Sequence, residues 1–220
     1  GYLASISYSD AQVGRLLDAL DAGPHAKNTI VVLWSDHGMH IGEKQQWEKF
    51  TLFEESTRVP FIIVAPGVTK PGSVCDRPVN LLDVYPTLNE LCQLPKRDDL
   101  DGVSLVPLLR GQNPKDWRNS IYYHYYEYPS VHMIPRHYGI RTERYKLMHF
   151  YQFGNEWELY DLQSDPNELQ NLYGKKNTVK LAADLKKQLR ALQKHYEDDS
   201  DISEKPQEWQ DKVRPGTAVK

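Results

Sequence analysis

The chain has 220 residues, of which 40% are hydrophobic and 26% are charged, and its formal net charge is −3. This composition is typical of a globular protein with a buried core, and the negative charge argues against non-specific binding to nucleic acid. No apolar stretch approaches the roughly 20 residues that a membrane-spanning helix needs, so no membrane span is expected. Because the sequence starts at Gly1 without a signal pattern, we expect it to be a piece of a longer protein.

The N-terminal half alternates expected helices and apolar strands. Residues 3–21 predict an amphipathic helix, because leucine, isoleucine and valine recur there at helical spacing. Residues 29–34 and 59–65 predict two strands without polar alternation, as in parallel strands that are covered on both faces. A further helix is expected over residues 81–94, with Asn80 or Asp83 as its cap. The pattern predicts an α/β domain over residues 1–112.

The C-terminal half has a different character. Gly111, Asn113 and Pro114 indicate a linker, and tyrosine-rich segments over residues 120–128, 137–151 and 156–162 predict a small antiparallel sheet. A helix that packs on this sheet is expected where apolar residues share one helical face: Leu181, Leu185, Leu189, Leu192 and Tyr196. We therefore expect an α+β subdomain over residues 113–200 and an extended tail over residues 201–220.

The two cysteines, Cys75 and Cys92, can form at most one disulfide and do not make a metal quartet. Cys92 loosely resembles the cysteine that some hydrolases oxidise, within a motif that has proline two places and arginine four places later. In this chain the proline and arginine follow three and five places later, so we interpret Cys92 as a buried thiol.

The first expected strand ends in Asp36-His37-Gly38. Ligands of open α/β sheets gather at the carboxyl ends of strands, and a carboxylate beside an imidazole can hold one divalent cation. Gly38 allows the backbone to turn away sharply. The alternative is structural: Asp36 caps a loop and His37 forms a hydrogen bond with it.

The segments around this turn resemble a known family over most of the chain. Residues 35–67, SDHGMHIGEKQQWEKFTLFEESTRVPFIIVAPG, resemble the metal-site strand and following loop of the sulfatases, within the alkaline phosphatase superfamily. CDRPVNLLDVYPTLNELCQLP, YGIRTERYKL and ELYDLQSDPNELQNL resemble later segments of the same family. The likeness is to the C-terminal half of an iduronate-2-sulfatase-type enzyme. It implies part of an alkaline-phosphatase-like sheet sandwiched by helices, followed by a small antiparallel sheet with a packed helix.

The resemblance also implies roles for individual residues. Asp36 and His37 match ligands of one calcium ion (Ca2+), and Lys49 matches a residue that contacts the sulfate group. Calcium prefers oxygen ligands, and many sulfatases have asparagine where this chain has His37, which leaves room for another metal. Lys49 would neutralise charge on the sulfate; the alternative is a lysine on the surface of a loop.

Family sulfatases use a formylglycine made from a Cys/Ser-x-Pro/Ala-x-Arg motif in the N-terminal half, and residues 1–220 lack that motif. The resemblance therefore implies the C-terminal half of a sulfatase, which needs the N-terminal half as its partner and is inactive alone. It also implies a periplasmic, secreted or lysosomal location.

A tyrosine-rich segment, followed by His137 and Arg141, predicts a site for a sulfated sugar such as a glycosaminoglycan fragment, because aromatic faces suit sugar rings and arginine binds sulfates. The alternative is that these residues only cover the sheet. His40 and Glu43 are further candidates for substrate binding, and His40 could serve as a leaving-group acid. A solvated loop histidine is the alternative for His40.

Three functions remain open. The first is a sulfuric ester hydrolase acting on a sulfated sugar. The second is a phosphate or phosphonate ester hydrolase of the same superfamily, although the single Asp-His pair with Lys49 favours a one-metal sulfatase. The third is a non-catalytic module that binds sulfated glycans.

Overall fold

The structure is a computed structural model that describes residues 1–128, 133–152 and 154–199. The chain forms two compact units, which we describe separately. Unit 1 comprises Gly1–Trp34, Pro60–Cys75 and Leu82–Pro114, and unit 2 comprises Ser35–Val59, Asp76–Leu81 and the described residues from Lys115 onward. The segment Ser35–Val59, expected in the first domain, groups with unit 2 because it packs on the C-terminal sheet. The tail expected over residues 201–220 lies outside the described residues.

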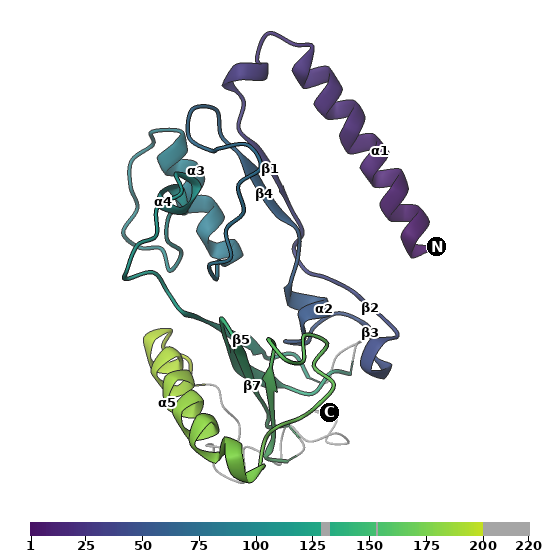
Figure 1. Cartoon of the computed structure of the whole chain (residues 1–220), viewed down its shortest axis with the longest axis vertical. Helices are drawn as coiled ribbons and strands as arrows, with labels where there is room; N and C mark the ends of the chain where they lie inside the picture. The colour runs from purple at the N-terminus through teal and green to yellow at the C-terminus, as the bar shows by residue number, and fades with distance from the viewer. Residues whose placement is uncertain (129–132, 153, 200–220) are drawn as a thin grey trace, which may run out of the picture. The chain divides into compact units, whose positions relative to one another are not determined.

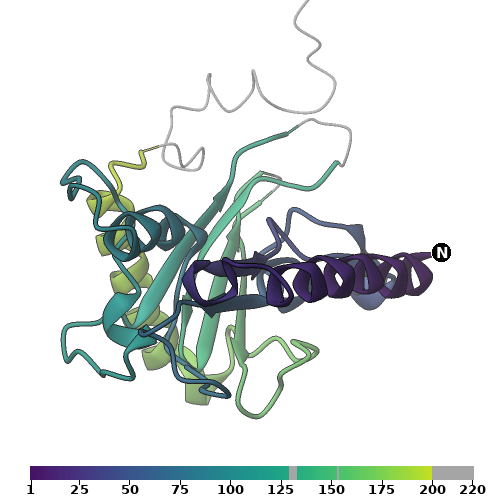
Figure 2. The ribbon, with the colours of Figure 1, turned by 90° about the horizontal axis from the view of Figure 1, so that it is seen from above.

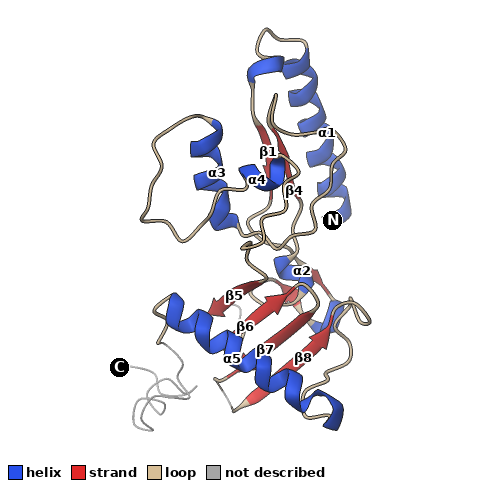
Figure 3. Cartoon of the chain, turned by 60° about the vertical axis from the view of Figure 1, so that its left-hand side comes forward, coloured by secondary structure: helices blue, strands red, loops and turns tan. Residues whose placement is uncertain are grey.

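Unit 1 consists of two short strands with helices on either side (Figure 1). Its elements are α1 (Tyr2–Asp21), β1 (Val31–Trp34), β4 (Phe61–Val64), α3 (Val84–Leu91) and α4 (Val106–Leu109). In Figures 1 and 3, α1 lies on one side of the strand pair and α3 and α4 lie on the other. The predicted α/β class is confirmed, and the helix expected over residues 3–21 is α1.

The two strands of unit 1 do not run as predicted. β1 and β4 pair antiparallel, with Val31 opposite Val64 and Trp34 opposite Phe61, so the expectation of parallel strands is wrong for this pair. The strands are also not covered on both faces within this chain, since Trp34 and Ile62 are about half exposed. An apolar run indicates that a strand is to be buried but does not encode the direction of its neighbour.

The helix expected over residues 81–94 starts as a 3-10 helix over Leu81–Asp83 and continues as α3, which ends at Leu91. Asp83 precedes it but makes no side-chain cap; its Oδ1 instead accepts a hydrogen bond from the backbone N–H of Val103 at 2.9 Å. The cap predicted for Asp83 is therefore wrong: this buried carboxylate holds a later segment of the chain. The interpretation of Cys92 as a buried thiol is also wrong, because Cys75 and Cys92 are both exposed and free.

Unit 2 is an antiparallel sheet with one long helix on one face, as predicted (Figures 2 and 3). The sheet order is β5-β6-β7-β8, formed by Ser120–Tyr125, His137–Thr142, Tyr145–Phe150 and Glu156–Asp161. The remaining α-helices and strands of unit 2 are β2 (His40–Ile41), β3 (Trp47–Glu48), α2 (Glu54–Thr57) and α5 (Val179–His195). Short 3-10 helices occur at Ala26–Asn28, Glu43–Gln45, Leu81–Asp83 and Lys176–Thr178.

The two faces of the sheet bury different partners. Because side chains alternate along a strand, Ile140, Leu147 and Leu159 form one core cluster with Leu185 and Leu189 of α5. On β7 and β8, Met148 and Tyr160 follow Leu147 and Leu159 and form a second cluster with Leu52 and Phe53. The segment that carries the predicted site is therefore packed against the sheet through apolar contacts.

Candidate metal and sulfate site

The turn that follows β1 is held by its own side chains and by α2. The backbone N–H of His37 donates to Oδ1 of Asp36 at 3.0 Å, and the Ser35 hydroxyl donates to the carbonyl oxygen of His37 at 2.6 Å. The N–H of Gly38 donates to the carbonyl oxygen of Ser56 at 2.8 Å. A Cβ on Gly38 would lie 1.9 Å from the carbonyl oxygen of Glu55, so only glycine allows this close approach. The loop cap proposed as the alternative for Asp36 is thus present.

Asp36, His37 and Lys49 converge at this turn. Nε2 of His37 lies 3.1 Å from Oδ2 of Asp36 and 2.5 Å from Nζ of Lys49. Nδ1 of His37 lies 2.8 Å from the carbonyl oxygen of Gly38, so Nδ1 carries the proton and donates it there. Nε2 is then the atom that accepts the hydrogen bond from Nζ of Lys49. The imidazole lone pair of His37 therefore faces the ammonium group of Lys49, while the carboxylate of Asp36 adjoins the same ring nitrogen.

Lys49 is placed by an unusual stretch of backbone. It follows β3 and lies between two residues with positive φ, Glu48 at 72° and Phe50 at 74°. Few residues other than glycine adopt this conformation, and such strain is concentrated at functional sites. Lys49 is partly buried and contacts His37, so it is not a freely solvated loop lysine.

The donor set fits part of a cation site. Asp36 offers a hard oxygen ligand and His37 offers a neutral nitrogen whose ring orientation is fixed by Gly38, as is usual for metal-bound histidines. Within residues 1–128, 133–152 and 154–199, no group of three or more His, Cys, Asp or Glu side chains could hold a metal ion. Two ligands alone make an incomplete site, so further ligands would have to come from outside these residues.

His40 and Glu43 occupy different environments. His40 is 1% exposed, and its Nε2–H donates to the Thr51 hydroxyl at 2.8 Å, which in turn donates to Ser56. Burial lowers the pKa of His40, against the opposing effect of the charge on Glu55. His40 is thus not the solvated loop histidine of the alternative. Glu43 is exposed, and its Oε2 accepts a hydrogen bond from the N–H of Ile41 at 2.7 Å.

His137 and Arg141 lie on β6, where both have partners within unit 2. His137 is fully buried, stacks on Phe150 with ring centroids 4.9 Å apart, and its Nδ1 bonds to the carbonyl oxygen of Pro135. Nε of Arg141 lies 3.5 Å from Oε1 of Glu54. Arg141 therefore contacts the first residue of α2, whereas His137 packs within the sheet and has no surface that a substrate could contact without rearrangement.

The tyrosine-rich strand β5 is largely engaged within unit 2. Tyr123 and Tyr125 contact the ring of His137, with ring centroids 5.6 Å apart in each pair. Tyr122 and Tyr126 donate to the carboxylate of Asp198, which also bonds to His124. These contacts are those expected for tyrosines that cover a sheet, while Tyr126 keeps about half of its surface exposed.

A buried cluster of charges was not predicted from the sequence. Lys146 lies between Glu54 and Glu168, with Nζ–Oε1 distances of 2.8 and 2.6 Å. Glu54 and Glu168 stand 114 residues apart in the chain, and no spacing or motif connects them to Lys146. The only local indication of this cluster in the sequence is that Lys146 lies in a largely apolar strand segment, YKLMHF.

The comparisons with known proteins identify the family of the chain. Residues 42–195 match the model of the family described as "N-sulphoglucosamine sulphohydrolase, C-terminal". The matched region is more than half of the chain, so the chain belongs to this sulfatase family, and the resemblance drawn from the sequence is confirmed.

Among its relatives, an N-acetylglucosamine-6-O-sulfatase of Bacteroides thetaiotaomicron is 41% identical over 199 residues, which are 90% of this chain and 36% of that protein. A solved structure of a protein in complex with its substrate D-glucosamine-2-N,6-O-disulfate is 38% identical, with a TM-score of 0.84, and the match covers 93% of this chain and 42% of that one. A phosphonate monoester hydrolase of Agrobacterium radiobacter is 28% identical, with a TM-score of 0.76, over 86% of this chain and 40% of that one.

The chain thus spans about a third of the length of the curated relatives that it matches, 36%, 31% and 35% for three of them. None of the helices that the structure describes is long and apolar enough to cross a membrane.

Proposed function

We propose that this chain is the C-terminal portion of a sulfuric ester hydrolase that removes sulfate from a sulfated sugar derived from glycosaminoglycan. The observation that carries the proposal is the arrangement around Nε2 of His37, which lies 3.1 Å from Oδ2 of Asp36 and 2.5 Å from Nζ of Lys49. The membership of the chain in a sulfatase family supports the same reaction.

Asp36 and His37 would hold one calcium ion, together with ligands from the N-terminal half. When bound, calcium would neutralise charge on the sulfate, and a formylglycine in that half would supply the nucleophile. In this chain, the bond from Nδ1 of His37 to Gly38 makes Nε2, which faces Lys49, the ring nitrogen that could act as a ligand. Lys49 presents a fixed ammonium group at the same point, where it can stabilise negative charge on sulfate oxygens or on the leaving oxygen.

The substrate class follows from two relatives, one named for the 6-O-sulfate of N-acetylglucosamine and one solved with a glucosamine disulfate. We therefore propose a 6-O-sulfated glucosamine unit as the first substrate to test. Glu43 is exposed and can bind sugar hydroxyls. His40 would support the site-bearing segment through Thr51 and Ser56, and Arg141 would support it through Glu54. His137 would stabilise the sheet through its aromatic contacts.

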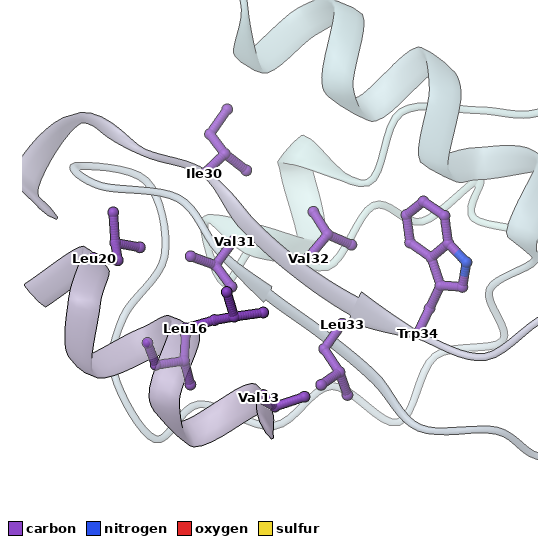
Figure 4. Close-up of a pocket in the computed structure, with 9 residues that line it drawn as sticks. Val13, Leu16, Leu20, Ile30, Val31, Val32, Leu33 and Trp34 are labelled. Atoms are coloured by element: carbon purple, nitrogen blue, oxygen red, sulfur yellow. The ribbon is translucent and has the colours of Figure 1, made fainter. Parts of the chain in front are cut away.

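The N-terminal half of the same enzyme is the proposed partner of unit 1. α1 has no buried residue, and Leu16 is 71% exposed. Figure 4 shows that apolar side chains of α1 and β1 line a common pocket, among them Val13, Leu16, Leu20, Val31 and Leu33. Apolar surface of this kind is normally covered, and about two thirds of the length of the relatives lies outside the matched region.

A second candidate is hydrolysis of phosphonate or phosphate monoesters. The structural match to a phosphonate monoester hydrolase favours it, because that protein shares the fold at 28% identity. The higher identity to the N-acetylglucosamine-6-O-sulfatase, 41%, favours the sulfatase.

The test uses the full-length parent protein, co-expressed with a formylglycine-generating enzyme and with the modification verified by mass. Release of sulfate from glucosamine-6-sulfate is measured with calcium and with chelator, beside a phenylphosphonate monoester. We expect calcium-dependent sulfate release that exceeds phosphonate hydrolysis. Preferential hydrolysis of the phosphonate would establish the second candidate, and binding of sulfated glycans without turnover would establish the non-catalytic alternative.

A further inference from the structure

The ammonium group of Lys146 is buried on the face of the C-terminal sheet that packs against the site-bearing segment. Lys146 is 0% exposed, and its Nζ lies 2.8 Å from Glu54 and 2.6 Å from Glu168. Arg141, on the neighbouring strand β6, adds a second cation at 3.5 Å from Glu54. Burial alone would raise the pKa of Glu54, but the positive charges of Lys146 and Arg141 outweigh it and lower that pKa. Glu54 is therefore held as an anion.

A buried ion cluster is a poor means of adding stability. The desolvation of its charges offsets most of their attraction, and apolar residues of similar volume often serve at least as well. Such clusters do impose a specific geometry, because each charge must meet its partner. The geometry that this cluster imposes is the position of α2 on the sheet.

The cluster holds the first turn of α2 through both side chain and backbone. The carboxylate of Glu54 binds Lys146, while the N–H of Glu54 donates to Oε2 of Glu168 at 2.8 Å. Because α2 has only four residues, contacts that fix its first residue also fix the position of the whole helix.

α2 in turn holds the predicted site. The carbonyl oxygen of Ser56 accepts the hydrogen bond from the N–H of Gly38, and the backbone of Glu55 lies so close to Gly38 that no Cβ would fit between them. Glu55 also binds Lys44 at 2.5 Å, which restrains the loop that leads to Lys49. A continuous set of contacts therefore runs from β7 through Lys146, Glu54 and α2 to Gly38, which adjoins His37.

We infer that Lys146 is a positioning residue, which uses Glu54 and Glu168 to fix α2 and thereby the turn that presents Asp36 and His37. The expected effect on catalysis and metal binding rests on the proposed function, whereas the expected effect on the turn does not. Residues that hold metal ligands in place without binding the metal typically contribute about 10- to 100-fold in metal affinity or activity.

The experiment compares two variants of the full-length protein with a matched control. Lys146→Met removes the buried charge. The triple variant E54Q/K146M/E168L removes the contacts of Glu54 with Lys146 and Glu168 and leaves no buried carboxylate without a partner. It serves as the test if Lys146→Met does not fold. The control is Arg144→Met, since Arg144 pairs with Asp161 at 2.7 Å on the same sheet and has no partner on α2 among the pairs that the structure describes.

The first readout is hydrogen exchange of the amides of Gly38 and Glu54, and the second is the affinity for calcium alone, measured by calorimetry. In the folded variants of the cluster, we expect both amides to exchange at least about tenfold faster and calcium to bind about 10- to 100-fold more weakly. Arg144→Met should change neither. Wild-type exchange at Gly38 in the folded triple variant would overturn the inference.

The two proposals fail in different ways. If the wild type binds no calcium and releases no sulfate, the proposed function fails, while the exchange of Gly38 still decides the role of Lys146. If turnover and calcium binding are present and unchanged in the folded triple variant, the positioning role fails and the proposed function stands.

Discussion

The N–H of Gly38 donates a hydrogen bond to the carbonyl oxygen of Ser56 at 2.8 Å, and this bond joins the Asp36-His37 turn to α2. The bond requires a backbone approach that leaves no room for a side chain, since a Cβ would lie 1.9 Å from the carbonyl oxygen of Glu55.

Gly38→Ala should therefore displace α2 or the turn. Because backbone atoms rather than a flexible side chain are in the way, we expect a loss of about 1–3 kcal/mol in stability and at least a tenfold loss of sulfate release by the full-length protein. Urea unfolding and turnover measure the two effects. Gly154→Ala is the control, because its Cβ would meet no atom closer than 3.9 Å. Wild-type turnover in Gly38→Ala would show that the turn tolerates displacement.

Lys49→Ala should remove a cation that lies 2.5 Å from His37. Removing a group that stabilises developing charge typically costs about 10²–10³ in kcat, and we expect a loss of this order in sulfate release, with the fold intact by circular dichroism. Asp36→Ala should also reduce turnover by orders of magnitude. Lys187→Ala, on the exposed face of α5, is the matched control. Near-normal turnover in Lys49→Ala would rule out the role assigned to this residue.

Burial lowers the pKa of His137 to about 4, against the opposing effect of its hydrogen bond to Pro135. The unfolded chain takes up this proton near pH 6.5, whereas the folded protein does so only near pH 4, so stability is lost as the pH falls through this window. At pH 5 the loss amounts to about 2 kcal/mol relative to pH 7.

His137→Phe keeps the aromatic contacts with Phe150 and Tyr123 but cannot take up a proton. Urea midpoints of the full-length protein at pH 7 and pH 5 should therefore differ less in this variant than in the wild type. Equal pH dependence in the two proteins would contradict the assignment of a buried, neutral His137.

Leu185 is 1% exposed and lies in the core between α5 and the sheet. Leu185→Ala should reduce the free energy of unfolding by about 2–5 kcal/mol, the usual cost of such a cavity. Leu169→Ala, at a position that is 72% exposed, should change it by less than about 0.5 kcal/mol. Similar unfolding midpoints for the two variants would mean that α5 does not contribute the core described for unit 2.

Elements defined by local periodicity were the most predictable part of the fold. The leucines of α1 and α5 recur at helical spacing, and the strands of the C-terminal sheet are bounded by turns, so both helices and the sheet were expected where they occur. The direction of β1 relative to β4 was not predictable, because a strand that is apolar throughout carries no information about its neighbour. Asp83 failed as a cap because Val103, 20 residues away, supplies a partner.

The site was predictable only through resemblance. Asp36-His37-Gly38 alone is compatible with a simple loop, and Lys49 is one of many lysines; the family pattern connected them. The buried state of His40 and His137 could not be read from the sequence, because histidine occurs both in cores and on surfaces. In the charge cluster, Lys146 lies 92 positions after Glu54 and 22 positions before Glu168. Local sequence patterns do not predict contacts over such separations.

The contact between Glu54 and Glu168 also has a temporal consequence. A ribosome delivers the chain from its N-terminus, so α2 emerges 114 residues before the glutamate that receives its first N–H. Contacts of such long range form slowly, and late in synthesis. We expect α2 and the turn that carries Asp36 and His37 to lack this anchor until the loop after β8, which contains Glu168, has been synthesised. A nascent chain that ends before this loop would present Asp36 and His37 without the contact that positions α2.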